Sequence, residues 1–372
     1  MRTVGACSPS LQPIALLSGF LRHSLHLHVV FSRAPHHKSR AADELLAIRL
    51  QKPWHPERAV RKNRYIMRKH RSLAAYSWQA VVALVVLTSL LILGCGLINS
   101  STPTQPPPPQ DGTLTVLFLD IGQGDSILIL SPGGHAMLID GGNSSRDANE
   151  VIIPALHAYG YDELDFLVAT HPDQDHIGGL VTVLQKVPVR YAVLTGQEHT
   201  TQTYEAFLKE ISRLKSAGQL TPIKARRGTP LDFDPALKVE VLAPGDDVVE
   251  TNDTNNASIV IRLTYGAVSF LFIGDAENEE EAWILDQGGD VQAQILKVSH
   301  HGGKTGTSEA WLNAVSPEVA VISVGADNHY GHPSSQVIER LARRKVKIYR
   351  TDQQGTITVT TDGSSYQVST EK

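Results

Sequence analysis

The sequence predicts an α/β domain of four layers over residues 111–372, with two β-sheets packed face to face and helices on both outer faces. From Thr113 onward, short apolar runs with β-branched residues alternate with segments of helical periodicity. The chain has 372 residues and is 41% hydrophobic, which is enough for one large or two small domains with real cores. No repeat of fixed period is present, and an αββα sandwich buries such a mixture of elements well.

Each element is predicted from its own pattern. Strands are expected where apolar residues run together between Gly, Asp and Pro turns, at 114–121, 126–130, 135–140, 164–170, 191–194, 237–243, 258–265, 268–274, 294–299, 319–325, 347–350 and 356–361. Helices are expected where apolar residues recur every three or four positions, at 149–159, 177–185, 203–217, 277–286, 308–315 and 335–343.

The first 110 residues are a different kind of polypeptide. They hold 14 Lys/Arg against 3 Asp/Glu, whereas residues 111–372 hold 20 against 35, a formal charge of −15. Residues 72–110 contain no charged side chain, and the apolar run Ala80 to Gly94 follows a basic cluster at Arg68 to Arg71. This pattern predicts an export or membrane segment with its N-terminal side in the cytoplasm, so we expect the later domain on the extracytoplasmic face of the cell membrane.

The apolar run ends in Gly94-Cys95, which resembles the lipobox of bacterial lipoproteins, where Cys95 would be lipidated. An uncleaved transmembrane anchor is the alternative, because 78–98 is long enough to cross roughly 30 Å of hydrocarbon, and a cleaved, secreted form is a third. Residues 67–98 are thus the signal or membrane segment. Residues 1–66 are interpreted as a non-native extension, with translation starting at Met67, or as a short cytoplasmic tail. The proline-rich stretch 99–110 is expected to be an extended tether.

The strongest chemical signal is the string Thr170 to Gly179, THPDQDHIGG, directly after an apolar strand. His171, Asp173, Asp175 and His176 place four potential ligands within six residues at a strand-to-helix turn. Imidazole nitrogen and carboxylate oxygen are ligands that Zn²⁺, Mn²⁺ and iron accept. A polar loop with a capping Asp is the ordinary explanation of a shorter motif, but the full string indicates a metal site.

The string resembles the H-x-H-x-D-H motif of metallo-β-lactamase-fold hydrolases, and more closely its variant in ComEC competence proteins and phosphorylcholine esterases. The resemblance covers nearly all of 113–370. It includes LDIGQGDSILI (119–129), LIDGG (138–142), NNASIVIRLTYG (255–266), FLFIGDA (270–276), LKVSHHGG (296–303) and AVISVGADNHYGHPS (320–334).

The resemblance implies a hydrolase with two divalent ions, Zn²⁺ or Mn²⁺. His171 and Asp173 would bind one ion, Asp175, His176 and His300 the other, and Asp275 both. Asp140 would support the ligands from behind. Two departures stand out: Asp173 replaces a second histidine, and Asn256 is found where a third metal-binding histidine is expected. We therefore expect the first ion to be held more weakly.

Other residues are secondary candidates. His301 is an alternative to His300 as the ligand, and His301 or His332 could act as the general acid, although loop histidines often only stabilise local structure. Lys304 and Asn256 are candidate substrate-binding residues, and Lys304 is equally well explained as a solvated side chain. The run DIGQGD, 120–125, either approaches the substrate with its backbone or forms a tight turn that shapes the fold.

These features predict hydrolysis of a phosphate ester by metal-activated water. The acidic domain argues against duplex DNA, because binding to phosphate backbones depends on basic surface; a small phosphodiester or a short single strand fits better. The alternatives are a β-lactam, lactone or thioester hydrolase, and a metal-bearing binding subunit of a DNA-uptake assembly whose pore a partner supplies.

Overall fold

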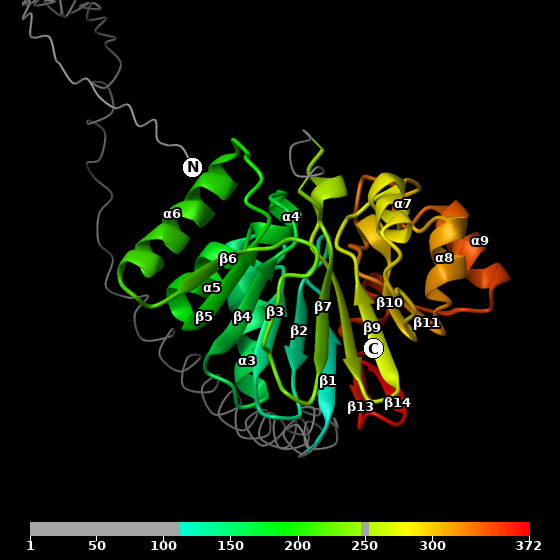
Figure 1. Ribbon diagram of the computed structural model, residues 1–372, viewed down its shortest axis with the longest axis horizontal. Coiled ribbons are helices and arrows are strands. Elements are labelled where there is room, and N and C mark those ends of the chain that lie inside the picture. Colours follow the sequence, from blue (N-terminus) through cyan, green and yellow to red (C-terminus); the bar gives the residue numbers. More distant parts are fainter. Residues whose placement is uncertain (1–111, 247–252) are drawn as a thin grey trace, which may run out of the picture. The chain divides into compact units, whose positions relative to one another are not determined.

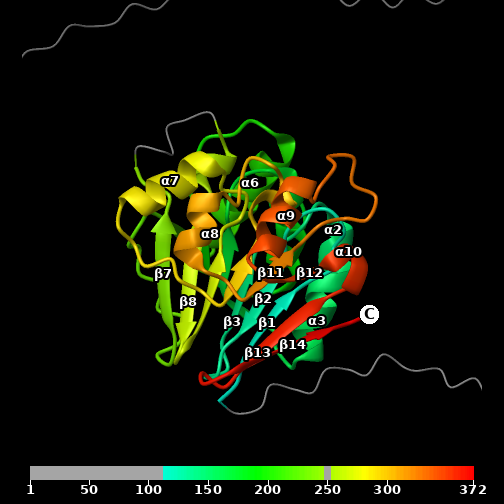
Figure 2. The same cartoon turned by 90° about the vertical axis from the view of Figure 1, so that its right-hand side faces the viewer.

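The computed structural model describes residues 112–246 and 253–372, all within the second of the two units into which the chain divides, Ser100–Lys372. Two β-sheets lie face to face, with helices on their outer faces (Figure 1). This is the predicted four-layer αββα arrangement. Figure 2, turned by 90°, shows the helices α8 and α9 in front of the second sheet.

The first sheet has the order β14-β13-β1-β2-β3-β4-β5-β6. Strands β14 to β3 of this order pair antiparallel, and β3 to β6 pair parallel. Its strands are β1 Leu114–Phe118, β2 Ile127–Leu130, β3 Ala136–Ile139, β4 Leu164–Ala169, β5 Val189–Leu194, β6 Thr221–Lys224, β13 Ile357–Thr361 and β14 Tyr366–Thr370.

The second sheet has the order β12-β11-β10-β9-β8-β7. Strands β9 to β12 are parallel, and β7, β8 and β9 pair antiparallel. Its strands are β7 Lys238–Ala243, β8 Val260–Tyr265, β9 Val268–Phe272, β10 Ile295–Lys297, β11 Val319–Ile322 and β12 Lys347–Arg350.

The helices divide between the two outer faces. The first sheet is covered by α2 Ser145–Asp147, a π-helical turn Ala148–Ile152, α3 Ile153–Ala158, α4 Gln174–Ile177, α5 Leu180–Lys186 and α6 Gln202–Ser216. The second sheet is covered by α7 Asn278–Asp286, α8 Glu309–Val315 and α9 Ser335–Arg343. Short connections contain α10 Thr351–Gln354 and the 3₁₀ turns Asn255–Ala257 and Ser299–Gly302.

Three apolar cores separate the four layers. The central core lies between the sheets, where Phe118 of β1 and Phe272 of β9 approach to 6.2 Å between ring centroids. Each sheet buries its other face under helices, for example under Phe207 of α6 and Trp311 of α8. Strands covered on both faces have uninterrupted apolar sequences, and β1, β2, β3, β4 and β9 are buried at every position.

The sequence missed two strands. β6 and β14 lie at the edges of the first sheet, and all their residues are partly or fully exposed, so neither has an apolar run. No helix within the described ranges is long and apolar enough to span a membrane. The expected membrane segment, Cys95, the extension 1–66 and the proline-rich tether all lie outside the described residues.

Candidate metal centre

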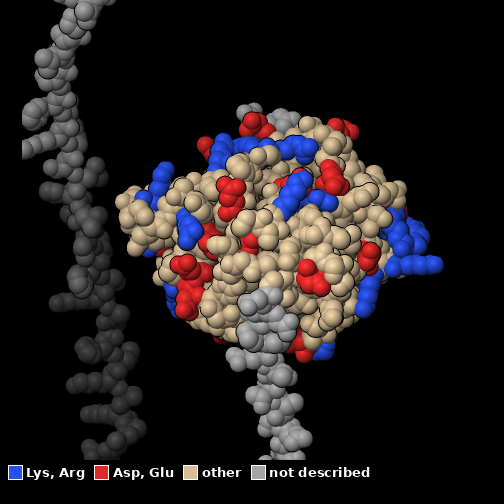
Figure 3. Space-filling view, turned by 60° about the horizontal axis from the view of Figure 1, so that its bottom comes forward, with Lys and Arg blue, Asp and Glu red and all other residues tan. Residues whose placement is uncertain are grey.

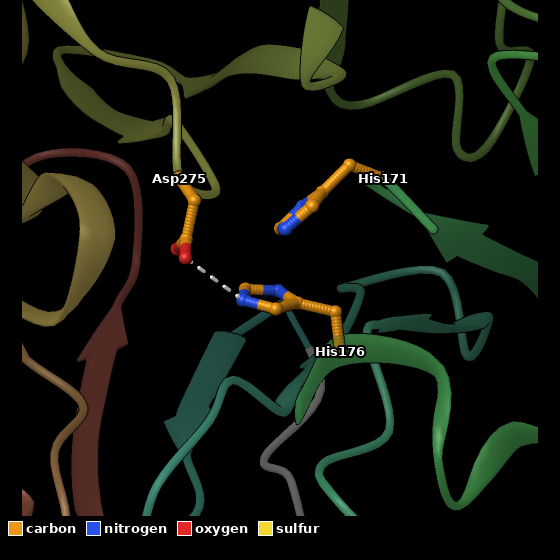
Figure 4. A group of neighbouring side chains, drawn as sticks. All are labelled: His171, His176 and Asp275. Atoms are coloured by element: carbon orange, nitrogen blue, oxygen red, sulfur yellow. Dashed lines mark ion pairs between the residues drawn. The ribbon is translucent and has the colours of Figure 1, made fainter. Parts of the chain in front are cut away.

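The site forms where the carboxyl ends of strands from both sheets meet. His171 and His176 follow β4 of the first sheet, and Asp275 follows β9 of the second. His301 lies in the 3₁₀ turn after β10, the neighbour of β9. Figure 4 shows His171, His176 and Asp275 pointing toward a common centre from these separate elements. The fold therefore brings Asp275 and His301, which are distant in the sequence, next to the histidines of the predicted motif.

The ligand atoms lie close to one another. Nε2 of His176 and Nε2 of His301 are each 3.3 Å from Oδ2 of Asp275, and His301 Nε2 is also 3.3 Å from Oδ2 of Asp175. Two groups of three donors result: His171, His176 and Asp275 form one, and Asp175, His176 and His301 form the other, each within 4.8 Å. These overlapping groups of donors could hold a metal ion.

Each imidazole is held by its outer nitrogen. Nδ1 of His176 lies 2.7 Å from Oδ2 of Asp140, Nδ1 of His301 donates to the Ser323 carbonyl at 2.9 Å, and Nδ1 of His171 lies 3.1 Å from the Thr170 hydroxyl. The inner Nε2 atoms of all three rings are buried and have no hydrogen-bond partner. Rings fixed through Nδ1, with Nε2 free to face a cation, are the usual form of metal-binding histidines. The residues therefore fit a metal.

Asp140, which the resemblance implies would support the ligands from behind, lies 2.7 Å from Nδ1 of His176. Its carboxylate, besides contacting His176, accepts hydrogen bonds from the backbone N–H and the hydroxyl of Thr170, at 2.8 and 2.7 Å. Asp140 is fully buried and has a positive φ of 59°. One carboxylate thus orients His176 directly and His171 through the Thr170 hydroxyl.

The electrostatics of the centre favour a cation. Burial and the neighbouring His176 lower the pKa of His171 to about 4, so that ring is neutral at neutral pH. Burial alone would lower the pKa of His176, but the carboxylates of Asp275 and Asp140 outweigh it and hold the pKa well above its ordinary value. Burial alone would raise the pKa of Asp275, but His176 and His301 hold it well below its usual range. The buried carboxylates thus stabilise positive charge on the imidazole that they contact, and they would stabilise a metal cation at the same place.

Asp173 lies at the edge of this cluster. Its Oδ2 is 3.9 Å from His171 Nε2, its side chain is 38% exposed, and its Oδ1 accepts a hydrogen bond from the Thr254 hydroxyl at 2.9 Å. Among the donors, it lies beside His171. Its exposure distinguishes it from the buried donors.

The structure places His301, rather than His300, among the buried donors. Both residues have positive φ values, 45° for His300 and 52° for His301, and their ring planes lie at 72° to each other. The His300 ring is 26% exposed; its Nδ1 lies 2.8 Å from Oε1 of Glu277, and its Nε2 lies 3.7 Å from Oδ2 of Asp275. His300 therefore lies beside the cluster, facing both solvent and the site.

The remaining candidates are less closely associated with the centre. The His332 ring lies 5.2 Å from His300 and 6.5 Å from His301 between centroids, at the rim. Lys304 is exposed in the following loop. Asn256 is buried and does not face a substrate. Its side-chain oxygen accepts hydrogen bonds from the backbone N–H groups of Glu277 and Glu280, at 3.1 and 3.2 Å, at the start of α7.

Sequence reasoning missed two residues behind His301. Asp125 and Lys297 form a buried ion pair, with Lys297 Nζ 2.6 Å from Asp125 Oδ2. The other oxygen, Oδ1, is 3.4 Å from His301 Nδ1. The motifs DIGQGD and LKVSHHGG contain both residues, but 172 positions separate them and nothing local shows that they pair.

Comparison with known proteins gives a family match and several relatives. The family model of the metallo-beta-lactamase superfamily matches residues 119–326. The chain is 32% identical to "ComE operon protein 3" of Bacillus subtilis over 64% of this chain and 32% of the relative. It is 31% identical to "Competence protein ComA" of Neisseria gonorrhoeae over 74% of this chain and 38% of the relative. The chain thus spans about a third of the length of these relatives.

Two solved structures are among those similar to this chain. A metallo hydrolase from the archaeon Ignicoccus hospitalis is 15% identical, with a TM-score of 0.42, over 66% of this chain and 98% of that one. A diphosphatase from the PhnP family is 12% identical, with a TM-score of 0.39, over 67% of this chain and 98% of that one.

Proposed function

Because the chain belongs to the metallo-β-lactamase superfamily, we propose that it is a metal-dependent hydrolase that cleaves phosphate esters with two divalent ions, Zn²⁺ or Mn²⁺. The observation that carries the proposal is the set of inward-facing donor atoms: Nε2 of His171, His176 and His301 and Oδ1 of Asp275 are all buried without a hydrogen-bond partner. Leaving buried polar atoms unpaired is unfavourable unless a ligand satisfies them.

The donors divide into two ligand sets that share Asp275. His171 and the partly exposed Asp173 would hold the first ion, and Asp175, His176 and His301 the second. When bound, divalent ions activate water near neutral pH and stabilise the negative charge that develops on the ester. The more exposed, oxygen-richer first set should release its ion more readily and favours Mn²⁺ there.

The chain's own residues prepare the site for the reaction. Asp140 and the Ser323 carbonyl fix the tautomers of His176 and His301, so both rings present Nε2 to the centre. His300 and His332 remain at the rim, where they can contact the ester or exchange a proton with it. Glu277 orients His300 by accepting from its Nδ1, and Lys304 offers a cation near the same rim for an anionic group.

The substrate is proposed to be a small phosphodiester or a short single strand of nucleic acid. One relative, "Competence protein ComA" of Neisseria gonorrhoeae, carries the word competence in its name, which supports a role beside a DNA-uptake partner. On the face shown in Figure 3, basic and acidic side chains are interspersed over the described domain. Together with the formal charge of −15 for residues 111–372, this distribution is poorly suited to a long duplex.

We also propose that the domain is held at the extracytoplasmic face of the membrane. The support is in the sequence: a basic cluster, the uncharged stretch 72–110 and the Gly94-Cys95 junction. Lipidation of Cys95 and an uncleaved anchor both give this location.

Asp275→Ala tests the hydrolase proposal on the full-length chain. The variant removes the shared ligand, so we expect phosphodiesterase turnover to fall by at least about 10³-fold and both ions to be lost. The substrates are bis-p-nitrophenyl phosphate, phosphorylcholine esters, single- and double-stranded DNA and a chromogenic cephalosporin, each with Mn²⁺ or Zn²⁺ and with chelator. Asp162→Ala, at a carboxylate that is 95% exposed, is the control.

Activity of Asp275→Ala near that of the wild type would remove the hydrolase assignment. If the cephalosporin were the only substrate cleaved, and chelator stopped its cleavage, the proposed substrate class would change from phosphate esters to carbonyl compounds. Tight metal binding without turnover of any substrate would favour a binding subunit instead.

A further inference from the structure

The buried ion pair between Lys297 and Asp125 is not explained by the donor set described above. Both side chains are about 1% exposed or less, and Nζ lies 2.6 Å from Oδ2. A buried pair of this kind is often no more stabilising than apolar side chains of similar size, because both charges must be removed from water. The position of the pair, directly behind His301, therefore indicates a role in the site.

Lys297 connects the two loops of the second sheet that carry donors. Its amine donates to the carbonyl of Val298 at 2.9 Å and approaches that of Gly274 at 3.5 Å. Gly274 directly precedes Asp275, and Val298 lies three positions before His301. One ammonium group thus ties the start of both loops to the first sheet through Asp125.

Asp125 contacts two of the proposed metal ligands, Asp175 and His301. Its backbone N–H donates to the carbonyl of Asp175 at 3.1 Å, and its Oδ1, which has no hydrogen-bond partner, lies 3.4 Å from Nδ1 of His301. The preceding Gly124 permits this approach, because a Cβ there would lie 2.2 Å from the Asp175 carbonyl oxygen. The turn is therefore packed directly against the second ligand set.

We propose that the turn Gly122–Asp125, together with Lys297, is a positioning device that holds Asp175 and His301 in place for the second ion. The inference rests on the proposed metal centre and extends it. Asp125 and Lys297 are positioning residues: the turn supports Asp175 through its backbone, and the ion pair sets the environment of the His301 ring. His171, a ligand of the first ion, is supported separately, by Thr170 and Asp140.

A mutant cycle of Asp125→Leu, Lys297→Met and the double variant tests the proposal on the full-length chain, in a His171→Ala background that isolates the second ion. Zn²⁺ and Mn²⁺ affinity is measured by competition with a chromophoric chelator, and Co²⁺ absorption reports the geometry of the bound ion. Melting in chelator reports the metal-free fold. Arg262→Met is the control, because Arg262 is a buried cation whose acidic partners, Glu240 and Asp290, lie outside the site.

We expect all three variants to bind the second ion about 10–100-fold more weakly, with an altered Co²⁺ spectrum. Each single variant leaves a buried charge unpaired and should lower the metal-free Tm by at least about 6 °C, whereas the double variant should recover most of it. Arg262→Met should lower Tm without changing ion affinity.

A double variant that binds the second ion with the affinity and Co²⁺ spectrum of its parent would overturn the inference and make the pair purely structural. A wild-type protein that binds no ion would overturn the metal centre itself, so the two failures are distinguishable.

Discussion

Alanine substitution of two adjacent histidines separates the possible ligands after β10. His301 is buried with Nε2 3.3 Å from oxygens of Asp175 and Asp275, whereas His300 is 26% exposed and contacts Glu277. Both residues have positive φ values, of 45° and 52°. Because alanine meets nearly the same backbone conformation at each position, the conformational cost largely cancels in the comparison, and the difference reports the side chains.

The expected difference follows from what each ring contacts. His301→Ala removes one of the four donors assigned to the second ion, and an ion contributes several kcal/mol of charge stabilisation to the transition state. A loss of about 4 kcal/mol corresponds to roughly 10³-fold in kcat/KM. His300→Ala removes a charge-assisted hydrogen bond of about 1.5–3 kcal/mol at the rim, or roughly 10- to 150-fold if all of it acts in the transition state.

The assay is kcat/KM for bis-p-nitrophenyl phosphate, combined with metal content after dialysis. We expect His301→Ala to lose the second ion and at least about 10³-fold in activity, and His300→Ala to retain both ions. A His301→Ala protein that keeps two ions, beside a His300→Ala protein that loses one, would refute this reasoning and restore the ligand assignment expected from the sequence.

Three further predictions concern stability and attachment. Burial raises the pKa of Glu280 well above 4.5, so the contribution of this carboxyl group to stability is full below its unfolded pKa and is lost as pH rises. Glu280→Gln, which cannot ionise, should therefore raise Tm by roughly 2–4 °C at pH 8, equivalent to about 1 kcal/mol, and by less at pH 5. An equal shift of Tm at both pH values would contradict this. Gly124→Ala should destabilise by about 1–3 kcal/mol in urea unfolding and weaken ion binding, because its Cβ meets the Asp175 carbonyl at 2.2 Å; unchanged unfolding would show that the turn adapts. Cys95→Ser should abolish lipid labelling while leaving the thermal melt of the domain unchanged, and labelling that persists would exclude Cys95.

The parts of the site that lie close in sequence were predictable. His171 to His176 follow an apolar strand within six residues, so strand and motif together place them at one sheet edge. Asp140, at the end of the next strand in the sheet, was predicted from a resemblance, and the structure gives its carboxylate the supporting position behind His176. The apolar strands were predictable for the same local reason, since a strand that is buried on both faces has consecutive apolar residues.

Features that depend on tertiary geometry were not predictable. His300 and His301 are adjacent in the sequence, which does not reveal that the His301 ring is the one facing Asp175 and Asp275. Lys297 lies between the apolar residues Leu296 and Val298 in a strand sequence, and only the fold brings Asp125 to its amine. Asn256 occupied a motif position, yet its side chain forms hydrogen bonds with the start of α7. In each case the deciding contact comes from another element.

The donors to the centre are divided between the two sheets: His171, Asp175 and His176 follow β4, while Asp275 and His301 follow β9 and β10. An ion bound there crosslinks the halves of the sandwich, and separating them requires releasing it. By mass action, an ion that only the folded chain binds adds about 2.7 kcal/mol to the unfolding free energy at a concentration of 100 times its Kd. Under the proposed metal centre, the supply of ions would therefore set the stability of the sandwich as well as its rate of hydrolysis.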